Sequence, residues 1–255
     1  MDFNLNIFIF LSISCFLAAF IDAIAGGGGV ISLPAYILSG MPMHYALGSN
    51  KFAVTFGCLG SSLKYILSGK INLKVLKYPI IVSFIGGILG AKSATLIKED
   101  ILEYIVIFLL IFTLIYTLLN KNLGVKNEFI EITKKINFLG TAWSLILGFY
   151  SGFFGPGSGG LMMLMFIKIY KYDFVTASGN AKIISFTSTF AGLLSFIYLG
   201  KIDYLYSVPM GIFMFLGGQL GAKYAITKGV RFVKIIFLII CFFTIISMGI
   251  SIFIK

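Results

Sequence analysis

The sequence predicts an all-α, polytopic membrane protein, a helix bundle built from two homologous halves. Of 255 residues, 59% are apolar and 11% are charged, whereas about a quarter of the residues in soluble domains are charged. Apolar runs with few charges follow one another along the chain. The segment 84–94, FIGGILGAKSA, returns at 215–225 as FLGGQLGAKYA. An internal duplication in a chain this apolar is typical of transporters.

Full-length membrane helices are predicted wherever an apolar run can cross a hydrocarbon core of about 30 Å. The runs are 5–24, 51–67, 75–97, 101–119, 137–154, 182–199, 205–226 and 232–254. Two shorter apolar stretches, 30–39 and 161–170, follow glycine clusters. A ten-residue helix reaches only ~15 Å and cannot cross. We therefore expect a glycine-broken helical hairpin at the start of each half, with irregular backbone at mid-membrane.

The halves divide the chain into three parts. Residues 1–119 form the first transmembrane repeat, 120–135 a polar loop between the repeats, and 136–255 the second repeat. Each repeat consists of the broken hairpin and three transmembrane helices. The apolar run before Ala25 imitates a cleaved signal peptide, but it lacks a basic n-region, so we expect it to be retained.

Charge counting favours inverted repeats. If each hairpin returns to its starting side, twelve Lys and Arg residues, Lys182 among them, face the cytoplasm, and four, Lys51 among them, face outside. If the broken run crosses once, the repeats are parallel and the split is nine to seven. The first split fits the positive-inside rule better and places both termini outside. The parallel arrangement stays open.

Composition and motifs exclude several classes of function. The net charge of +11 comes from lysines that lie mainly at the ends of apolar runs, where they anchor helices, so no nucleic-acid partner is expected. The three cysteines lie in apolar runs without CxxC spacing, which indicates neither a disulfide framework nor a metal site. No P-loop, nucleophile elbow, HExxH or zinc pattern is found, so an enzyme is disfavoured and no cofactor is expected.

Asp22 is the acidic residue that lies within an apolar run, one helical turn before the first glycine cluster. A carboxylate in the membrane faces the bundle interior or water and often marks a substrate or proton path. Alternatively, Asp22 caps the broken backbone by accepting hydrogen bonds from freed N–H groups. The sequence leaves proton coupling and a structural role open.

The two glycine-rich breaks are candidate anion sites. Each precedes a short helix, so unpaired N–H groups and the positive end of the helix dipole should face a cavity. The candidate residues are Gly26, Gly27, Gly28 and Gly29 in the first break, and Gly157, Ser158 and Gly159 in the second. Close helix packing through small residues is the alternative. We favour packing for the glycines of the duplicated segments and a ligand site for the breaks.

Two Asn/Lys pairs occupy matched positions in the halves: Asn50 aligns with Asn180, and Lys51 with Lys182. We expect each pair to open a helix, with Asn as the N-cap. A lysine in the first turn is opposed by the helix dipole and needs a negative partner, which an anionic substrate could provide. Snorkelling to lipid headgroups is the alternative.

The chain resembles the TauE/SafE family of sulfite exporters and sulfonate permeases. The resemblance rests on DAIAGGGG at 22–29 and ALGSNK at 46–51 in the first half, and on GFFGPGSG at 152–159 and ASGNAK at 177–182 in the second. It implies a secondary transporter in the cytoplasmic membrane that moves small sulfur-containing or organic anions, with the broken segments and the Asn/Lys pairs near the substrate.

The expected partners are a small anionic solute and membrane lipid, and a homodimer is consistent with the resemblance. An anion channel, a carrier of a neutral solute, a membrane scaffold without flux and an intramembrane enzyme remain as alternatives.

Overall fold

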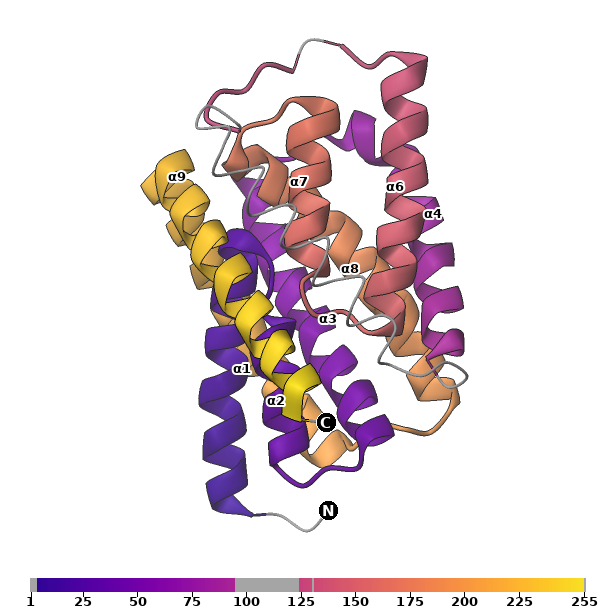
Figure 1. Ribbon diagram of the computed structural model, residues 1–255, viewed down its shortest axis with the longest axis vertical. Coiled ribbons are helices and arrows are strands. Elements are labelled where there is room, and N and C mark those ends of the chain that lie inside the picture. The colour runs from indigo at the N-terminus through magenta and orange to yellow at the C-terminus, as the bar shows by residue number, and fades with distance from the viewer. Residues whose placement is uncertain (1–3, 95–123, 130, 255) are drawn as a thin grey trace.

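The computed structural model describes residues 4–94, 124–129 and 131–254. Within these residues the protein is all-helical, as predicted. The helices in Figure 1 are α1 (Leu5–Ala25), α2 (Gly29–Leu38), α3 (Met43–Leu67), α4 (Leu73–Ser93), α6 (Lys134–Phe153), α7 (Ser158–Tyr170), α8 (Phe174–Tyr198) and α9 (Tyr204–Ile254). Gly229, with φ 78° and ψ −169°, divides α9 into two helical segments. The run expected at 101–119 lies outside the described residues.

Four of the described helices are long and apolar enough to cross a membrane: α1, α4, α8 and the part of α9 from Tyr204 to Ile239. The short helix α2 has 10 residues, the length that was predicted. Helix α7 has 13, because it begins at Ser158, three residues before the predicted stretch 161–170. Many large apolar side chains on the long helices are exposed, for example Leu5, Ile81 and Ile212. Such a surface is stable against lipid rather than water.

The starts of α3 and α8 differ from the prediction. Each begins eight residues earlier than the apolar run that predicted it, at Met43 and Phe174. Apart from His44, the added residues 43–50 and 174–181 are buried or partly buried. Tertiary packing therefore stabilises these helical turns, which an uninterrupted apolar run did not predict. The prediction that the Asn/Lys pairs open these helices is therefore wrong. The N-caps are Pro42 and Asp173.

The helices of the two parts run in opposite senses in Figure 1. Helix α1 rises from the lower end to mid-height and α2 returns downward, whereas α6 descends from the upper end and α7 returns upward. Helix α3 then rises while α8 descends, and α4 descends while the first segment of α9 rises. Both breaks, between α1 and α2 and between α6 and α7, consequently lie near mid-height.

The two parts interlock through their long helices. Helix α4 packs on α6 and α8, and α9 packs on α1 and α3. Glycines of the duplicated segments make these contacts: Gly90 of α4 abuts the carbonyl of Phe149, and Gly221 of α9 abuts the carbonyl of Phe20. The packing role expected for the duplicated glycines is confirmed, and it recurs at matching positions.

Gly90→Ala is expected to destabilise the protein by about 1–3 kcal/mol, because its Cβ would overlap backbone atoms of Phe149 and Phe153, which cannot move aside without shifting α6. Gly192→Ala in α8 is the matched control, since its Cβ would meet only atoms at ordinary contact distance, 3.6 Å or more. Thermal unfolding of both variants in detergent measures the difference. Equal midpoints would show that α4 and α6 can separate at little cost.

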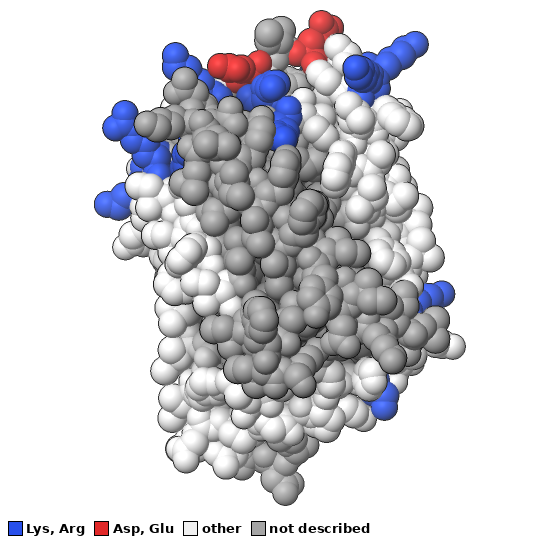
Figure 2. Space-filling view, viewed as in Figure 1, with Lys and Arg blue, Asp and Glu red and all other residues white. Residues whose placement is uncertain are grey.

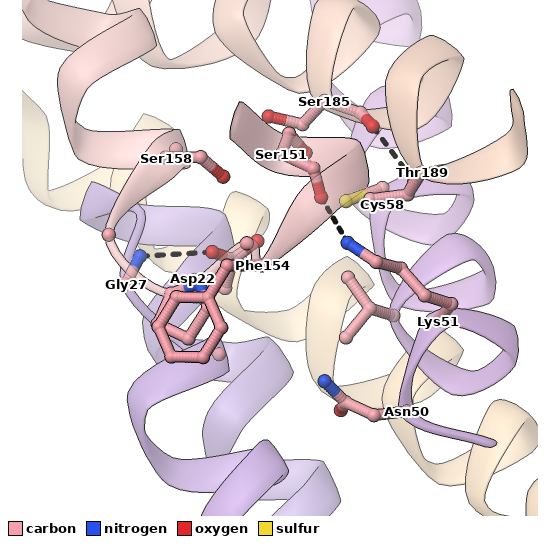
Figure 3. A pocket seen from close by; sticks show the side chains of 16 residues that line it. Asp22, Gly27, Asn50, Lys51, Cys58, Ser151, Phe154, Ser158, Ser185 and Thr189 are labelled. Carbon is pink, nitrogen blue, oxygen red and sulfur yellow. Dashed lines mark hydrogen bonds between the residues drawn. The ribbon is translucent and has the colours of Figure 1, made fainter. Parts of the chain in front are cut away.

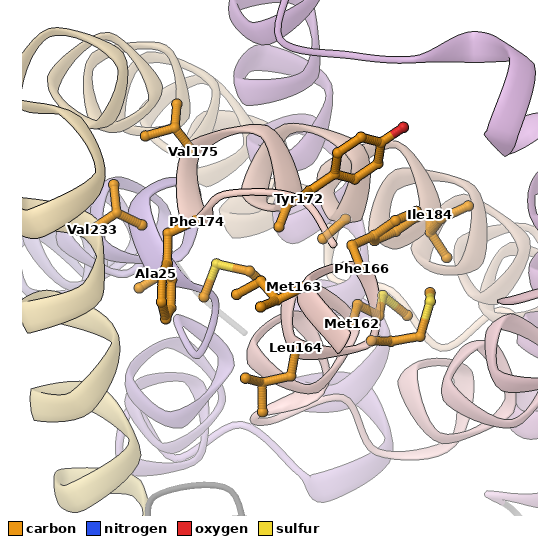
Figure 4. Packing of buried hydrophobic residues seen from close by; sticks show 14 of the residues in the cluster. Ala25, Met162, Met163, Leu164, Phe166, Tyr172, Phe174, Val175, Ile184 and Val233 are labelled. Atoms are coloured by element: carbon orange, nitrogen blue, oxygen red, sulfur yellow. The ribbon is translucent and has the colours of Figure 1, made fainter. Parts of the chain in front are cut away.

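Helix α7 is buried in protein from Ser158 to Ile167, and only its last turn is partly exposed. Met162, Met163 and Phe166 are almost fully buried, and they pack against Phe174 and neighbouring apolar residues from α8 and α9 (Figure 4). Irregular backbone at membrane depth is stable only where protein or a cavity surrounds it. The enclosure of α7 allows the second break to stay in the interior without exposing its polar backbone to lipid.

Candidate functional site

The two breaks touch each other in the centre of the bundle. A Cβ on Gly26 would collide with the backbone of Gly159 and Gly160, so the first break crosses directly over the start of α7. Gly26 also has φ 73°, a left-handed value that favours glycine. This close approach fixes the N-terminal ends of α2 and α7 beside one another.

A small cavity of about 30 Å³ lies between the breaks and the facing sides of α3 and α8 (Figure 3). It has room for one or two water molecules. Its lining comprises Asp22, Gly27, Gly29, Asn50, Lys51, Val54, Cys58, Ser151, Phe154, Gly155, Pro156, Gly157, Ser158, Gly159, Ser185 and Thr189. Seven of the predicted substrate-binding residues line it: Gly27, Gly29, Asn50, Lys51, Gly157, Ser158 and Gly159.

Four predicted substrate-binding residues lie away from this lining. Gly26 packs on α7, and Gly28 packs on the carbonyl of Ala18. Asn180 accepts a hydrogen bond from the N–H of Asn72 at 3.0 Å, which ties α8 to the start of α4. Lys182 is buried in an ion pair.

The alignment of Asn50 with Asn180 is wrong by one residue. Asn180 is the seventh residue of α8, and the seventh residue of α3 is Ser49. Ser49 accepts a hydrogen bond from the N–H of Asp203 at 3.0 Å, the counterpart of the bond between Asn180 and Asn72. Lys51 and Lys182 do match, because each is the ninth residue of its helix.

Asp22 holds the first break together. Its Oδ1 accepts hydrogen bonds from the N–H groups of Gly27 at 3.1 Å and Gly28 at 3.3 Å. Its Oδ2 accepts from the ammonium of Lys182 at 2.6 Å. These bonds are the ones expected if Asp22 caps the broken backbone. They also give Lys182, whose side chain is 1% exposed, a negative partner inside the protein.

Lys51 is buried without such a partner. Its side chain is 3% exposed, and its ammonium donates a hydrogen bond to the backbone carbonyl of Ser151 (Figure 3). The ion pair of Asp22 with Lys182 is the salt bridge found within the described residues, and no described carboxylate bonds to Lys51. A buried ammonium is costly unless a negative charge compensates it. As an ammonium, Lys51 therefore gives the cavity a positive charge that no described carboxylate compensates.

Polar groups without partners among the described residues line the same cavity. The N–H groups of Gly29, Gly157 and Gly159 have no acceptor among the described residues. Asn50 is 5% exposed, and its amide oxygen is buried with no partner in the described part of the chain. Rotation exchanges the oxygen and nitrogen of an amide, so Asn50 can also present donors to the cavity.

Burial of Lys51 and Lys182 corrects the charge count made from the sequence. Neither lysine lies in a loop, so the inverted split becomes eleven to three. In the parallel arrangement both lysines were counted outside, so that split becomes nine to five. The inverted arrangement still fits the positive-inside rule better. Neither lysine snorkels to headgroups, since both ammonium groups point into the bundle.

Sequence reasoning missed the wall residues contributed by the two long helices. They stand three and seven positions after each lysine: Val54 and Cys58 on α3, and Ser185 and Thr189 on α8. Following the helical period forward from the aligned lysines could have identified them. No pattern in the sequence pointed to Ser151, which lies at the end of α6. No group of three or more metal-binding side chains occurs in the part of the chain that the structure describes.

A bundle of apolar helices with two half-length helices meeting at a charged central cavity has the architecture of a membrane transporter. Comparison with known proteins supports this class. The family model for the sulfite exporter TauE/SafE family matches residues 11–248. The chain belongs to this family.

Curated relatives carry the same general description. The chain is 36% identical over 239 residues to the probable membrane transporter protein ORF9 of Sinorhizobium sp, covering 94% of this chain and 91% of the relative. It is 34% identical over 244 residues to a probable membrane transporter protein of Haemophilus influenzae, with 95% and 94% covered. It is 31% identical over 222 residues to the probable membrane transporter protein YfcA of Escherichia coli, with 86% and 80% covered. No solved structure matches it significantly.

Proposed function

We propose that this protein is a secondary transporter of small anions in the cytoplasmic membrane, and that its substrates are sulfur-containing or organic anions such as sulfite, sulfonates and thiosulfate. The observation that carries the proposal is the buried ammonium of Lys51, which lines the central cavity without a carboxylate partner among the described residues. A bound anion would compensate that charge. The description of the matching family model as a sulfite exporter supports the sulfur-containing class.

The breaks supply further attraction for an anion. Helices α2 and α7 begin at the cavity, and the positive ends of their dipoles lie there. The N–H groups of Gly29, Gly157 and Gly159, which have no acceptor in the described part of the chain, can donate hydrogen bonds to an oxyanion. With Lys51 and the hydroxyl of Ser158, these groups form a site that favours negative charge over a neutral solute.

We infer that the two parts are inverted repeats and that alternating access occurs between them. Opposite helix directions in Figure 1 support the inversion. Lys and Arg side chains gather at the upper end in Figure 2, which by the positive-inside rule faces the cytoplasm. The described residues of these loops and adjoining helix ends are Lys70, Lys74, Lys77, Lys126, Lys134, Lys135, Lys168, Lys171, Lys228 and Arg231.

The inverted arrangement puts the end of α9 outside, because α9 finishes at the end opposite these charges. A reporter enzyme that is active only in the periplasm, fused after Lys255, is therefore expected to be active. The same reporter inserted beside Lys70, in the loop between α3 and α4, is expected to be inactive. The reverse pattern would contradict the orientation.

The test of the function is flux in liposomes that contain the purified protein. Uptake of labelled sulfite, thiosulfate, a sulfonate and short carboxylates is compared with uptake of glycerol and with protein-free liposomes. We expect saturable uptake of at least one anion and none of glycerol. Flux of glycerol without anion flux would overturn the proposal in favour of a neutral-solute carrier.

A carrier and a channel respond differently to substrate on the opposite side of the membrane. Liposomes preloaded with unlabelled substrate are expected to accumulate labelled substrate faster than empty ones. The reason is that the binding site of a carrier reorients across the membrane more quickly when substrate occupies it. Flux that is linear in anion concentration and unaffected by preloading would indicate a channel instead. An imposed proton gradient, applied in the same assay, reports whether protons drive the transport.

A further inference from the structure

The side chain of each matched lysine contacts a matched position in the other half of the molecule. One lysine contacts a carboxylate there, and the other contacts a backbone carbonyl. Lys182 of α8 reaches Asp22 of α1, and Lys51 of α3 reaches Ser151 of α6. Asp22 and Ser151 each lie four residues before the first glycine of positive φ in their break, Gly26 at 73° and Gly155 at 105°. Ser151 therefore stands where an acid equivalent to Asp22 would stand.

The backbone donors around these two positions follow the same pattern. In the first break, the Asp22 carboxylate accepts from the N–H groups of Gly27 and Gly28. The residues five and six positions after Ser151 are Pro156, which has no N–H, and Gly157, whose N–H has no acceptor among the described residues. The second break thus keeps a lysine and a backbone donor but lacks the carboxylate that unites them.

The surroundings of Lys51 leave this place open to a ligand. Gly155 lies directly beside the ammonium, since a Cβ there would be 3.1 Å from Nζ. The hydroxyl of Ser151 accepts a hydrogen bond from Ser188 at 3.1 Å on the α8 side. Asn50, which is buried and has an unpartnered amide oxygen, lines the same cavity.

We propose that the anionic group of the substrate binds in the second break as the Asp22 carboxylate binds in the first, bridging the ammonium of Lys51 and the N–H of Gly157. This inference rests on the proposed function and deepens it by naming the class of group recognised. The group carries one negative charge or more on at least two oxygens bonded to a single atom, as carboxylates, sulfonates and sulfite do. The two donors set this selectivity, and Ser151 leaves the place open because it supplies no carboxylate of its own. Because the cavity holds only one or two water molecules, entry of the group displaces Lys51 from the Ser151 carbonyl.

The test is to supply the missing acid. In Ser151→Asp, the new carboxylate pairs with Lys51 and competes with the substrate, so the affinity for labelled sulfite is expected to fall about 30-fold or more. Ser151→Asn has the same shape without the charge, and a much smaller loss is expected. Thermal unfolding in detergent accompanies both, and Ser151→Asp is expected to be at least as stable as the original protein because it gains an ion pair.

Competition on the unaltered protein provides a second arm that does not depend on folding of a variant. Methanesulfonate and acetate are expected to displace labelled sulfite, whereas chloride, which has no pair of oxygens, is expected to compete at least tenfold more weakly. Equal competition by chloride would overturn the inference, and so would sulfite binding by Ser151→Asp that matches Ser151→Asn. If the unaltered protein binds none of these anions, the proposed function itself fails.

Discussion

Asp22→Asn is expected to destabilise the folded protein by about 3–5 kcal/mol, the usual cost of leaving one member of a buried ion pair uncompensated. Lys182 has 1% of its side chain exposed, so its ammonium cannot recover its hydration when the carboxylate is lost. The amide of Asn can still accept from Gly27 and Gly28, so the capping of the break is largely kept. The loss of stability therefore reports the charge of Asp22. Unfolding in detergent by a denaturant series measures it.

The double variant Asp22→Asn/Lys182→Met separates this cause from damage to the break. Removing both charges eliminates the uncompensated ammonium, so the double variant is expected to recover most of the lost stability. A double variant as unstable as Asp22→Asn would mean that the carboxylate acts through the backbone instead. Proton-driven flux measured in the same variants tests whether Asp22 also couples protons, the alternative that its hydrogen bonds leave open.

The half-length helices were predictable from the sequence, since a short apolar stretch after a glycine cluster has few other solutions in a membrane. The stretch 30–39 predicted α2 to within one residue at each end. The starts of α3 and α8 were not predictable in this way. The segments before Lys51 and Lys182 contain Ser, Gly and Asn and read as loops, and only their burial between other helices makes them helical.

The unequal roles of the two lysines also required the structure. The sequence places Lys51 and Lys182 at matched positions and gives no reason to treat them differently. Lys182 pairs with Asp22, 160 residues away, because α8 crosses to the opposite half of the bundle. Periodicity within one helix carries no information about such a crossing. The sequence therefore made both lysines candidates for substrate binding, whereas in the structure only Lys182 has a carboxylate partner among the described residues.

Lys51→Met is expected to reduce anion affinity by about 30-fold to several thousand-fold, since truncating one partner of a buried charge pair costs about 2–5 kcal/mol. Its effect on stability should be opposite to that of Asp22→Asn. Without bound anion, the ammonium of Lys51 is buried against a carbonyl alone, so replacing it by a side chain of similar length removes an unfavourable charge. Flux in liposomes and unfolding in detergent, measured on the same preparation, give both quantities.

Lys77→Met is the matched control for this change, because Lys77 is exposed at the positively charged end of α4. We expect it to alter neither flux nor the unfolding midpoint appreciably. A Lys51→Met protein that loses both stability and flux would identify Lys51 as a packing residue. A Lys51→Met protein that keeps both its stability and its flux would mean that other residues compensate the charge of the substrate. Loss of flux together with equal or greater stability is the combination that a substrate-binding cation produces, since such a residue lowers the stability of the empty protein for the sake of its ligand.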